Sequence, residues 1–128
     1  MKGLRLYKIE KLCSETAISR LFSRGDRQVG SSMAYPLRVA WRIDGTREVK
    51  CPRFLVSVPK KRLRHAVDRV TMRRRIREAY RLNRSEISPG MPADIALIYV
   101  ADRLLPYAKV EAAVRRLLAA VKPLEEER

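Results

Sequence analysis

Metal-binding and nucleophilic side chains are scarce in this chain of 128 residues. Its one histidine is His65, and its two cysteines, Cys13 and Cys51, stand far apart in the sequence. A zinc site takes closely spaced Cys and His ligands, and a cysteine nucleophile takes a histidine partner. We therefore expect free, packed thiols in a reducing compartment, with neither a zinc centre nor Cys/His catalysis.

Catalytic motifs and long apolar runs are missing as well. The sequence holds no HExxH, no GxSxG, no Walker glycine loop and no close carboxylate pair in an apolar setting. It also lacks a run of about 18 apolar residues that could span a membrane, and residues 1–12 lack the apolar stretch of a signal peptide. We expect a cytoplasmic protein that has no membrane partner and does not cut nucleic acid unaided.

Acidic residues are few relative to basic ones. Lys and Arg number 29 against 14 for Asp and Glu, which gives a net charge of +15. Such a charge speeds association with polyanions and favours DNA or RNA as the partner, with an anionic membrane surface as the weakest candidate. The length suits one two-layer core. We therefore predict a single RNA-binding domain over residues 1–128, with an extended arm at 1–12 and a frayed tail at 122–128.

The most basic stretch runs from Arg64 to Arg84 and ends before a loop rich in Ser, Pro and Gly. As one α-helix it has an apolar arc formed by Met72, Ile76, Ala79 and Tyr80. Its opposite arc carries Arg73, Arg74, Arg77, Arg81 and Arg84. The acids that usually relieve repulsion on a solvated face are limited to Asp68 and Glu78. This favours a nucleic-acid backbone as the partner, and a merely solvated face is the alternative.

An amphipathic helix is also predicted between Ser14, a good N-cap, and Gly25, a plausible C-cap. Its apolar stripe consists of Ala17, Ile18, Leu21 and Phe22. Phe22 is either a core residue or a side chain that stacks on a base or sugar in a nucleic-acid cleft.

The remaining pattern predicts strands and one more helix. Period-two alternation indicates a strand over residues 35–43 and another over 49–58, and the turn signal Asp44-Gly45 would make them antiparallel neighbours if it forms a hairpin. Residues 94–101 are apolar on both faces, which is typical of a central strand. A last helix is expected from Tyr107 to Val121. The order predicts an α+β two-layer sandwich.

The run from Phe54 to Arg81, FLVSVPKKRLRHAVDRVTMRRRIREAYR, resembles the signature of the bacterial ribonuclease P protein component. That signature is a strand followed by a Ser-Val-x-Lys-Lys step, an Ala-Val and a helix with Arg-Asn-x-x-Lys-Arg-x-x-Arg-Glu. Here the helix segment extends from Arg69 to Glu78, with Val70 and Thr71 in place of the usual Asn and Arg. The upstream helix also fits, with Ile18 where the family has an aromatic. The resemblance covers roughly residues 11–120.

The resemblance implies a fold and an activity. The family fold is a two-layer α/β sandwich of order α-β-β-β-α-β-α, of the ribosomal protein S5 domain 2-like type, with an unusual left-handed crossover. The protein pairs with a large catalytic RNA, whose bound Mg²⁺ hydrolyses precursor tRNA and so removes its 5′ leader. No obligate protein partner is implied.

The resemblance also implies the site residues. Docking on the catalytic RNA is expected from Lys60, Lys61, Arg69, Arg73, Arg74, Arg77 and Arg81. A cleft for the single-stranded leader is expected from Phe22, Ile18 and Tyr80. No residue of the chain is expected to be catalytic, and Mg²⁺ is expected to be held mainly by the RNA. The alternatives are a stand-alone RNA-binding protein, ribosomal-like or regulatory, with no role in tRNA processing, and a protein-only nuclease.

Overall fold

The computed structural model describes residues 18, 19, 21, 22, 29–43, 52–84 and 93–121. Six elements follow in chain order: β1 (Val29–Ala34), β2 (Leu37–Ile43), β3 (Arg53–Ser57), α2 (Ala66–Asn83), β4 (Ala93–Tyr99) and α3 (Tyr107–Ala120). The N-terminal arm, the C-terminal tail and most of the first expected helix lie outside the described residues, although Ile18 and Leu21 are helical. The described part is therefore an α+β fold.

The four strands form one mixed sheet in the order β1-β2-β4-β3. β4 pairs antiparallel with β2 and parallel with β3, so it occupies the interior of the sheet. All seven of its residues are buried, which confirms the prediction of a central strand there. The expected pairing between the strands over 35–43 and 49–58 is wrong, because β4 lies between β2 and β3.

The hairpin of this sheet lies one strand earlier than expected. β1 and β2 are antiparallel neighbours, joined by a turn at Tyr35-Pro36, whose peptide bond is cis. The alternating pattern from Tyr35 onward therefore spans a turn and a strand, and β2 begins only at Leu37. The Pro36 carbonyl accepts a bond from Val100 N at 2.9 Å, which ties the turn to the chain that leaves β4.

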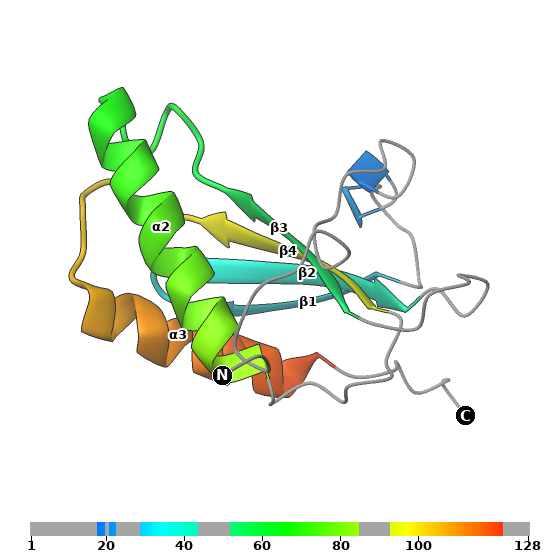
Figure 1. The fold of residues 1–128 in the computed structure, drawn as a ribbon. Helices are drawn as coiled ribbons and strands as arrows, with labels where there is room; N and C mark the ends of the chain where they lie inside the picture. The colour runs from blue at the N-terminus through cyan, green and yellow to red at the C-terminus, as the bar shows by residue number, and fades with distance from the viewer. Residues whose placement is uncertain (1–17, 20, 23–28, 44–51, 85–92, 122–128) are drawn as a thin grey trace.

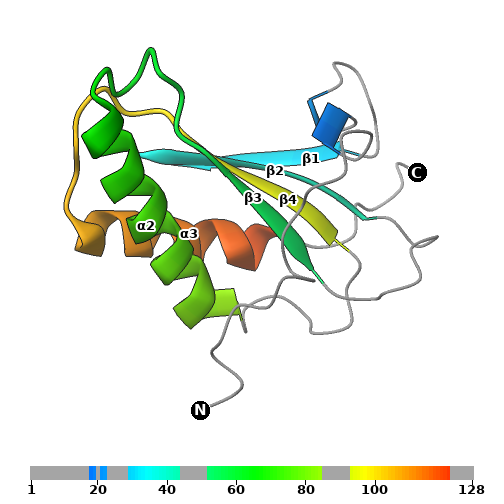
Figure 2. The same ribbon diagram turned by 45° about the horizontal axis from the view of Figure 1, so that its top comes forward.

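Helices α2 and α3 cover one face of the sheet, as both ribbon views show (Figure 1, Figure 2). The core between the layers contains alternate residues of the strands, among them Leu37, Val39, Ile95 and Leu97. α2 adds Met72, Ile76, Ala79 and Tyr80, so its predicted apolar arc is confirmed. α3 adds Val110, Ala113, Val114, Leu117 and Leu118, as its predicted stripe requires.

The other face of the sheet carries a smaller cluster. Leu21 packs there on Ala96 and Ile98, with Ile18 and Leu55 at its edge. The helical segment that contains Ile18 therefore lies across the sheet from α2 (Figure 1). This arrangement places the basic helix α2 and Phe22, which follows Leu21, on opposite sides of the sheet.

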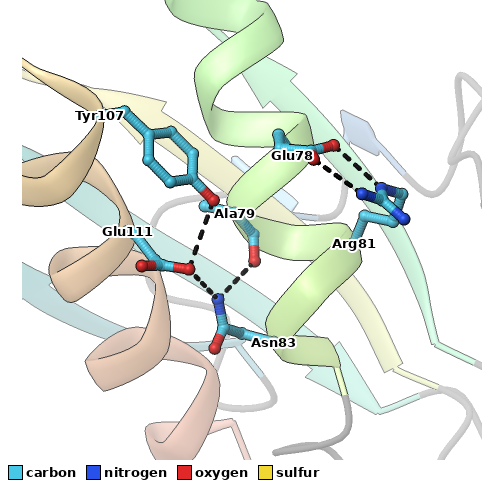
Figure 3. Close-up of polar contacts among 6 residues, drawn as sticks. All are labelled: Glu78, Ala79, Arg81, Asn83, Tyr107 and Glu111. Carbon is cyan, nitrogen blue, oxygen red and sulfur yellow. Dashed lines mark hydrogen bonds and ion pairs between the residues drawn. The ribbon is translucent and has the colours of Figure 1, made fainter. Parts of the chain in front are cut away.

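A polar network fixes the end of α2 against α3 (Figure 3). Asn83 Nδ2 donates to the Ala79 carbonyl at 2.8 Å and to Glu111 Oε2 at 3.3 Å. The Tyr107 hydroxyl donates to the same Glu111 oxygen at 3.3 Å. Arg115 Nε donates to Asn83 Oδ1 at 3.2 Å. Because Asn83 is buried, these bonds satisfy its amide and set the position of the helix end.

Candidate nucleic-acid interface

The outer side of α2 carries four arginines. Arg74 and Arg77 are exposed, and Arg73 and Arg81 are half-buried beside them. Val70 lies in the same face and leaves 41% of its surface exposed. The predicted basic arc thus faces away from the core along the length of the helix.

Neutralising acids on this face are few. Glu78 forms a two-point pair with Arg81, with Nε–Oε1 at 2.9 Å and Nη2–Oε2 at 2.7 Å (Figure 3). The bond from Arg81 lowers the pKa of Glu78 below its ordinary value. Arg73, Arg74 and Arg77 have no ion pair with any residue that the structure describes. Three cationic heads are therefore available to an external anion.

A tight turn presents Lys60 and Lys61 at the entrance to α2. The Pro59 carbonyl accepts bonds from Arg62 N at 3.0 Å and Leu63 N at 3.3 Å, and both lysines are exposed. Leu63 is buried and anchors the turn to the core. The two lysines thus continue the cationic surface of α2 beyond its first turn.

Arg69, also expected to contact RNA, holds the protein's own backbone. Its Nη1 donates to the Leu63 and Arg64 carbonyls, both at 2.9 Å. On a wheel with about 100° per residue, Arg69 falls on the apolar side of α2, between Ile76 and Tyr80. In the structure Arg69 therefore holds the turn that carries Lys60 and Lys61, here called the lysine turn, against the helix.

Arg75 is a positioning residue that the sequence pattern did not single out. Its Nη1 donates to the Leu105 carbonyl, in the loop before α3, at 2.6 Å. On the helical wheel Arg75 flanks the apolar arc, and this position next to the core could have indicated a structural role from the sequence alone. The eight arginines of the basic stretch therefore divide between outward-facing and structural side chains.

A second surface lies on the opposite face of the sheet. Phe22 leaves 48% of its surface exposed there, next to the buried Leu21, and Ile18 is half-buried. Arg38 is exposed on the same face, since it pairs in register with Ile98 of the small cluster. An aromatic ring and a cation thus share this face.

Tyr80 does not join them, and its expected place in the leader cleft is wrong in this structure. Its side chain is fully buried and lies in the core between α2 and the sheet. The ring stacks on Phe54 with centroids 4.0 Å apart, on the side of the sheet remote from Phe22. A fully buried ring offers no surface to an RNA strand.

The described residues include no group of three His, Cys, Asp or Glu side chains that could hold a metal ion. They also include no helix that is both long and apolar enough to cross a membrane.

Comparisons with known sequences agree on one family. Residues 6–122 match the family model Ribonuclease P. The ribonuclease P protein component of Porphyromonas gingivalis strain W83 is 36% identical over 121 residues, covering 91% of this chain and 85% of that protein. The corresponding protein of Chlorobaculum tepidum is 31% identical over 121 residues, covering 81% of this chain and 74% of that protein.

Comparisons with solved structures show the same fold. The Staphylococcus aureus RNase P protein matches with a TM-score of 0.71 at 20% identity, covering 91% of this chain and 98% of that one. The Thermotoga maritima RNase P protein matches with a TM-score of 0.68 at 21% identity, covering 88% and 98%. By sequence and by fold, the chain belongs to the bacterial ribonuclease P protein family, the protein component of a ribonucleoprotein endoribonuclease that processes tRNA.

Proposed function

We propose that this protein uses its two sheet faces for two different RNAs in the cytoplasm. The cationic surface of α2 and the lysine turn dock on the catalytic RNA of ribonuclease P. The face that carries Phe22 contacts the single-stranded 5′ leader of precursor tRNA. The observation that carries the proposal is the outward row of Arg73, Arg74 and Arg77 on α2, which form no ion pair with any described residue.

Docking on a structured RNA suits the α2 surface. Arginine and lysine bind phosphates and riboses of folded RNA largely without reading sequence. Arg73, Arg74 and Arg77 supply such contacts along the helix, and Lys60 and Lys61 extend them at its entrance. Arg69 supports this surface by holding the turn that carries both lysines. Arg81 can join once a phosphate competes with Glu78 for its guanidinium.

Leader contact suits the opposite face. A single strand of varied sequence is bound by stacking on aromatic rings and by cations along its backbone. Phe22 offers an exposed ring, Arg38 an exposed cation and Ile18 an apolar flank. Tyr80 has no part in this proposal.

The separation of the two faces depends on the path of the chain between β3 and β4. These strands are parallel neighbours, and α2 connects them. We propose that this connection is the family's left-handed crossover. The hand of a crossover decides which face of the sheet its helix covers, and so keeps the basic helix away from the leader face.

Hydrolysis belongs, in this proposal, to Mg²⁺ held mainly by the catalytic RNA. The described residues include no group of three His, Cys, Asp or Glu side chains that would hold a metal ion without the RNA, and Mg²⁺ at phosphates is commonly bound by phosphate oxygens with few protein ligands. The protein's own contribution is to bind and orient both RNAs with cations and stacking.

The experiment compares two variants in two binding assays. Replacing Arg73, Arg74 and Arg77 by Ala should weaken binding of the catalytic RNA and flatten its salt dependence, with the unfolding temperature nearly unchanged. Replacing Phe22 by Ala should leave that affinity unchanged and weaken the holoenzyme's grip on precursor tRNA that carries a leader.

The opposite pattern has a clear meaning. A collapse in stability with an unaltered salt slope would show that the three arginines are structural. Tight binding to some other RNA, with no effect on the catalytic RNA or on cleavage, would instead support a stand-alone RNA-binding protein.

A further inference from the structure

A third cationic surface lies on the helix side of the sheet, at the end where the β1–β2 turn meets α3. An open hollow there is lined by Ala34, Tyr35, Pro36, Arg103, Leu105, Lys109, Ala112, Ala113 and Arg116. Neither α2's arginines nor the face that carries Phe22 contributes to it. We propose that this hollow binds an unpaired nucleotide of the catalytic RNA, with the base on Tyr35 and the phosphates on Arg103, Lys109 and Arg116.

Small residues make up much of the lining of the hollow. Ala34 and Pro36 come from the hairpin, and Ala112 and Ala113 come from α3. Tyr35 also lines the hollow and leaves 61% of its surface exposed. An exposed ring beside small apolar residues suits the flat face of a base, and stacking on such a ring tolerates any base.

The charged side chains that line the hollow are all basic. Arg103, Lys109 and Arg116 are exposed, and the lining includes no acid. Lys109 and Arg116 are seven residues apart, so they lie two turns apart on one side of α3. The acid of this helix, Glu111, is bonded to Tyr107 and Asn83 on the α2 side (Figure 3). It therefore does not neutralise the hollow.

The loop that carries Arg103 is held from two directions. The Tyr99 hydroxyl donates to the Arg103 carbonyl at 2.5 Å, and Arg75 donates to the Leu105 carbonyl at 2.6 Å. A cation on a fixed loop loses less conformational entropy on binding than one on a free loop. Arg75 thus links the position of this hollow to α2.

The hollow adjoins the loop before α2, which indicates that its ligand is the same catalytic RNA that docks on α2. Arg103 also lines a neighbouring hollow together with Lys61, Arg62, Leu63, Arg64, His65, Asp68 and Asp102. The loop before α2 and the loop before α3 lie side by side in both ribbon views (Figure 1, Figure 2). An RNA that docks on the lysine turn therefore reaches Tyr35 by way of Arg103. Paired A-form RNA keeps its bases stacked inside, so the nucleotide on Tyr35 is an unpaired one.

The test measures affinity for the catalytic RNA alone over a range of salt concentrations. Tyr35→Leu should weaken binding by about five- to a hundredfold, the effect of losing one base–aromatic stack, whereas Tyr35→Phe should bind like the wild type. Arg116→Gln should lower the salt slope by about one phosphate contact. Arg116→Lys is the matched control, because it keeps the charge at the same position of α3 and should keep the salt slope.

This inference rests on the proposed function, and the same assay separates the two. If the Arg73, Arg74 and Arg77 variant loses affinity while Tyr35→Leu binds normally, the hollow is not an RNA site and the α2 proposal stands. If that arginine variant binds normally, the α2 proposal fails, whatever Tyr35→Leu does. A Tyr35→Leu effect that appears only with leader-bearing precursor tRNA would also overturn the inference, because the occupant would then be the leader. Thermal unfolding of each variant identifies any loss that comes from misfolding.

Discussion

The ring of Tyr80 stacks on Phe54 at a centroid distance of 4.0 Å and an interplanar angle of 17°. This contact joins α2 to β3, so the helix that carries the outward arginines is fixed to the sheet at its C-terminal half. In the proposed RNA binding, Tyr80 would therefore act only through the position of α2. The two aromatic residues expected in one cleft differ in their surroundings, since Tyr80 is fully buried and Phe22 is exposed.

Tyr80→Ala should lower the free energy of unfolding by about 3–5 kcal/mol, because it removes a large buried side chain and leaves a cavity. Phe22→Ala is the matched control and should change it by less than about 1 kcal/mol, since 48% of the surface of that residue already faces solvent. Denaturant unfolding measures both. Similar losses for the two variants would mean that Phe22 is a core residue after all.

The neighbouring residues Arg74 and Arg75 should give opposite results when each is replaced by Ala. Arg74→Ala should reduce the slope of log K against log salt concentration, for binding of the catalytic RNA, by roughly 0.7 to 0.9. It should change the free energy of unfolding by less than about 0.5 kcal/mol. Arg75→Ala should cost about 1–2 kcal/mol of stability, because the Leu105 carbonyl loses its charged donor. The account fails here if Arg75→Ala is as stable as the wild type.

Glu78→Gln should strengthen binding of the catalytic RNA at low salt, by less than about tenfold, because it frees the guanidinium of Arg81 and removes an acid from the basic face. The lowered pKa of Glu78 means that the charged carboxylate adds stability above its ordinary pKa and loses this contribution as pH falls through the lowered value. The variant should therefore be slightly less stable at pH 7, and its stability should lack the decrease at acidic pH that Glu78 contributes. Weaker RNA binding by Glu78→Gln would show that the pair itself is needed.

Tyr107 should make stability fall at alkaline pH. Burial, followed by the adjacent Glu111, raises the pKa of its phenol above the ordinary 10.0. Above pH 10 the unfolded chain then loses this proton before the folded chain does, so stability falls as pH rises through the raised pKa. Tyr107→Phe removes the hydrogen bond to Glu111, so its free energy of unfolding should be lower by about 0.5–1.5 kcal/mol at pH 7. Its stability should also decline less steeply at alkaline pH. An unchanged decline in thermal unfolding between pH 9 and 11 would contradict this.

Local patterns in the sequence predicted α2, α3 and the inner strand well. The burial of Met72 and Ile76 and the exposure of Arg74 and Arg77 follow from helical periodicity alone. The burial of residues 95–99 in β4 follows from their apolar pattern on both faces, whereas the burial of Asp94 does not.

Contacts between residues distant in sequence could not be predicted in the same way. The turn signal Asp44-Gly45 in the sequence suggested a hairpin, but β4, some fifty residues later, lies between β2 and β3. The backbone roles of Arg69 and Arg75 depend on where the loops at Leu63 and Leu105 lie. Tyr80 belongs to the apolar arc by periodicity, and only its stack on Phe54 shows that it cannot also line a cleft.

The central claim is that this protein assists a catalytic RNA through the outward cations of α2. The most direct measurement is cleavage of precursor tRNA at low Mg²⁺ by the cognate catalytic RNA alone, with the wild-type protein, and with the variant in which Arg73, Arg74 and Arg77 are replaced by Ala. The account predicts that the wild type restores cleavage at the mature 5′ end and that the variant restores little of it until the salt concentration is lowered. Equal cleavage with and without the wild-type protein, under conditions where it binds the RNA, would contradict the account.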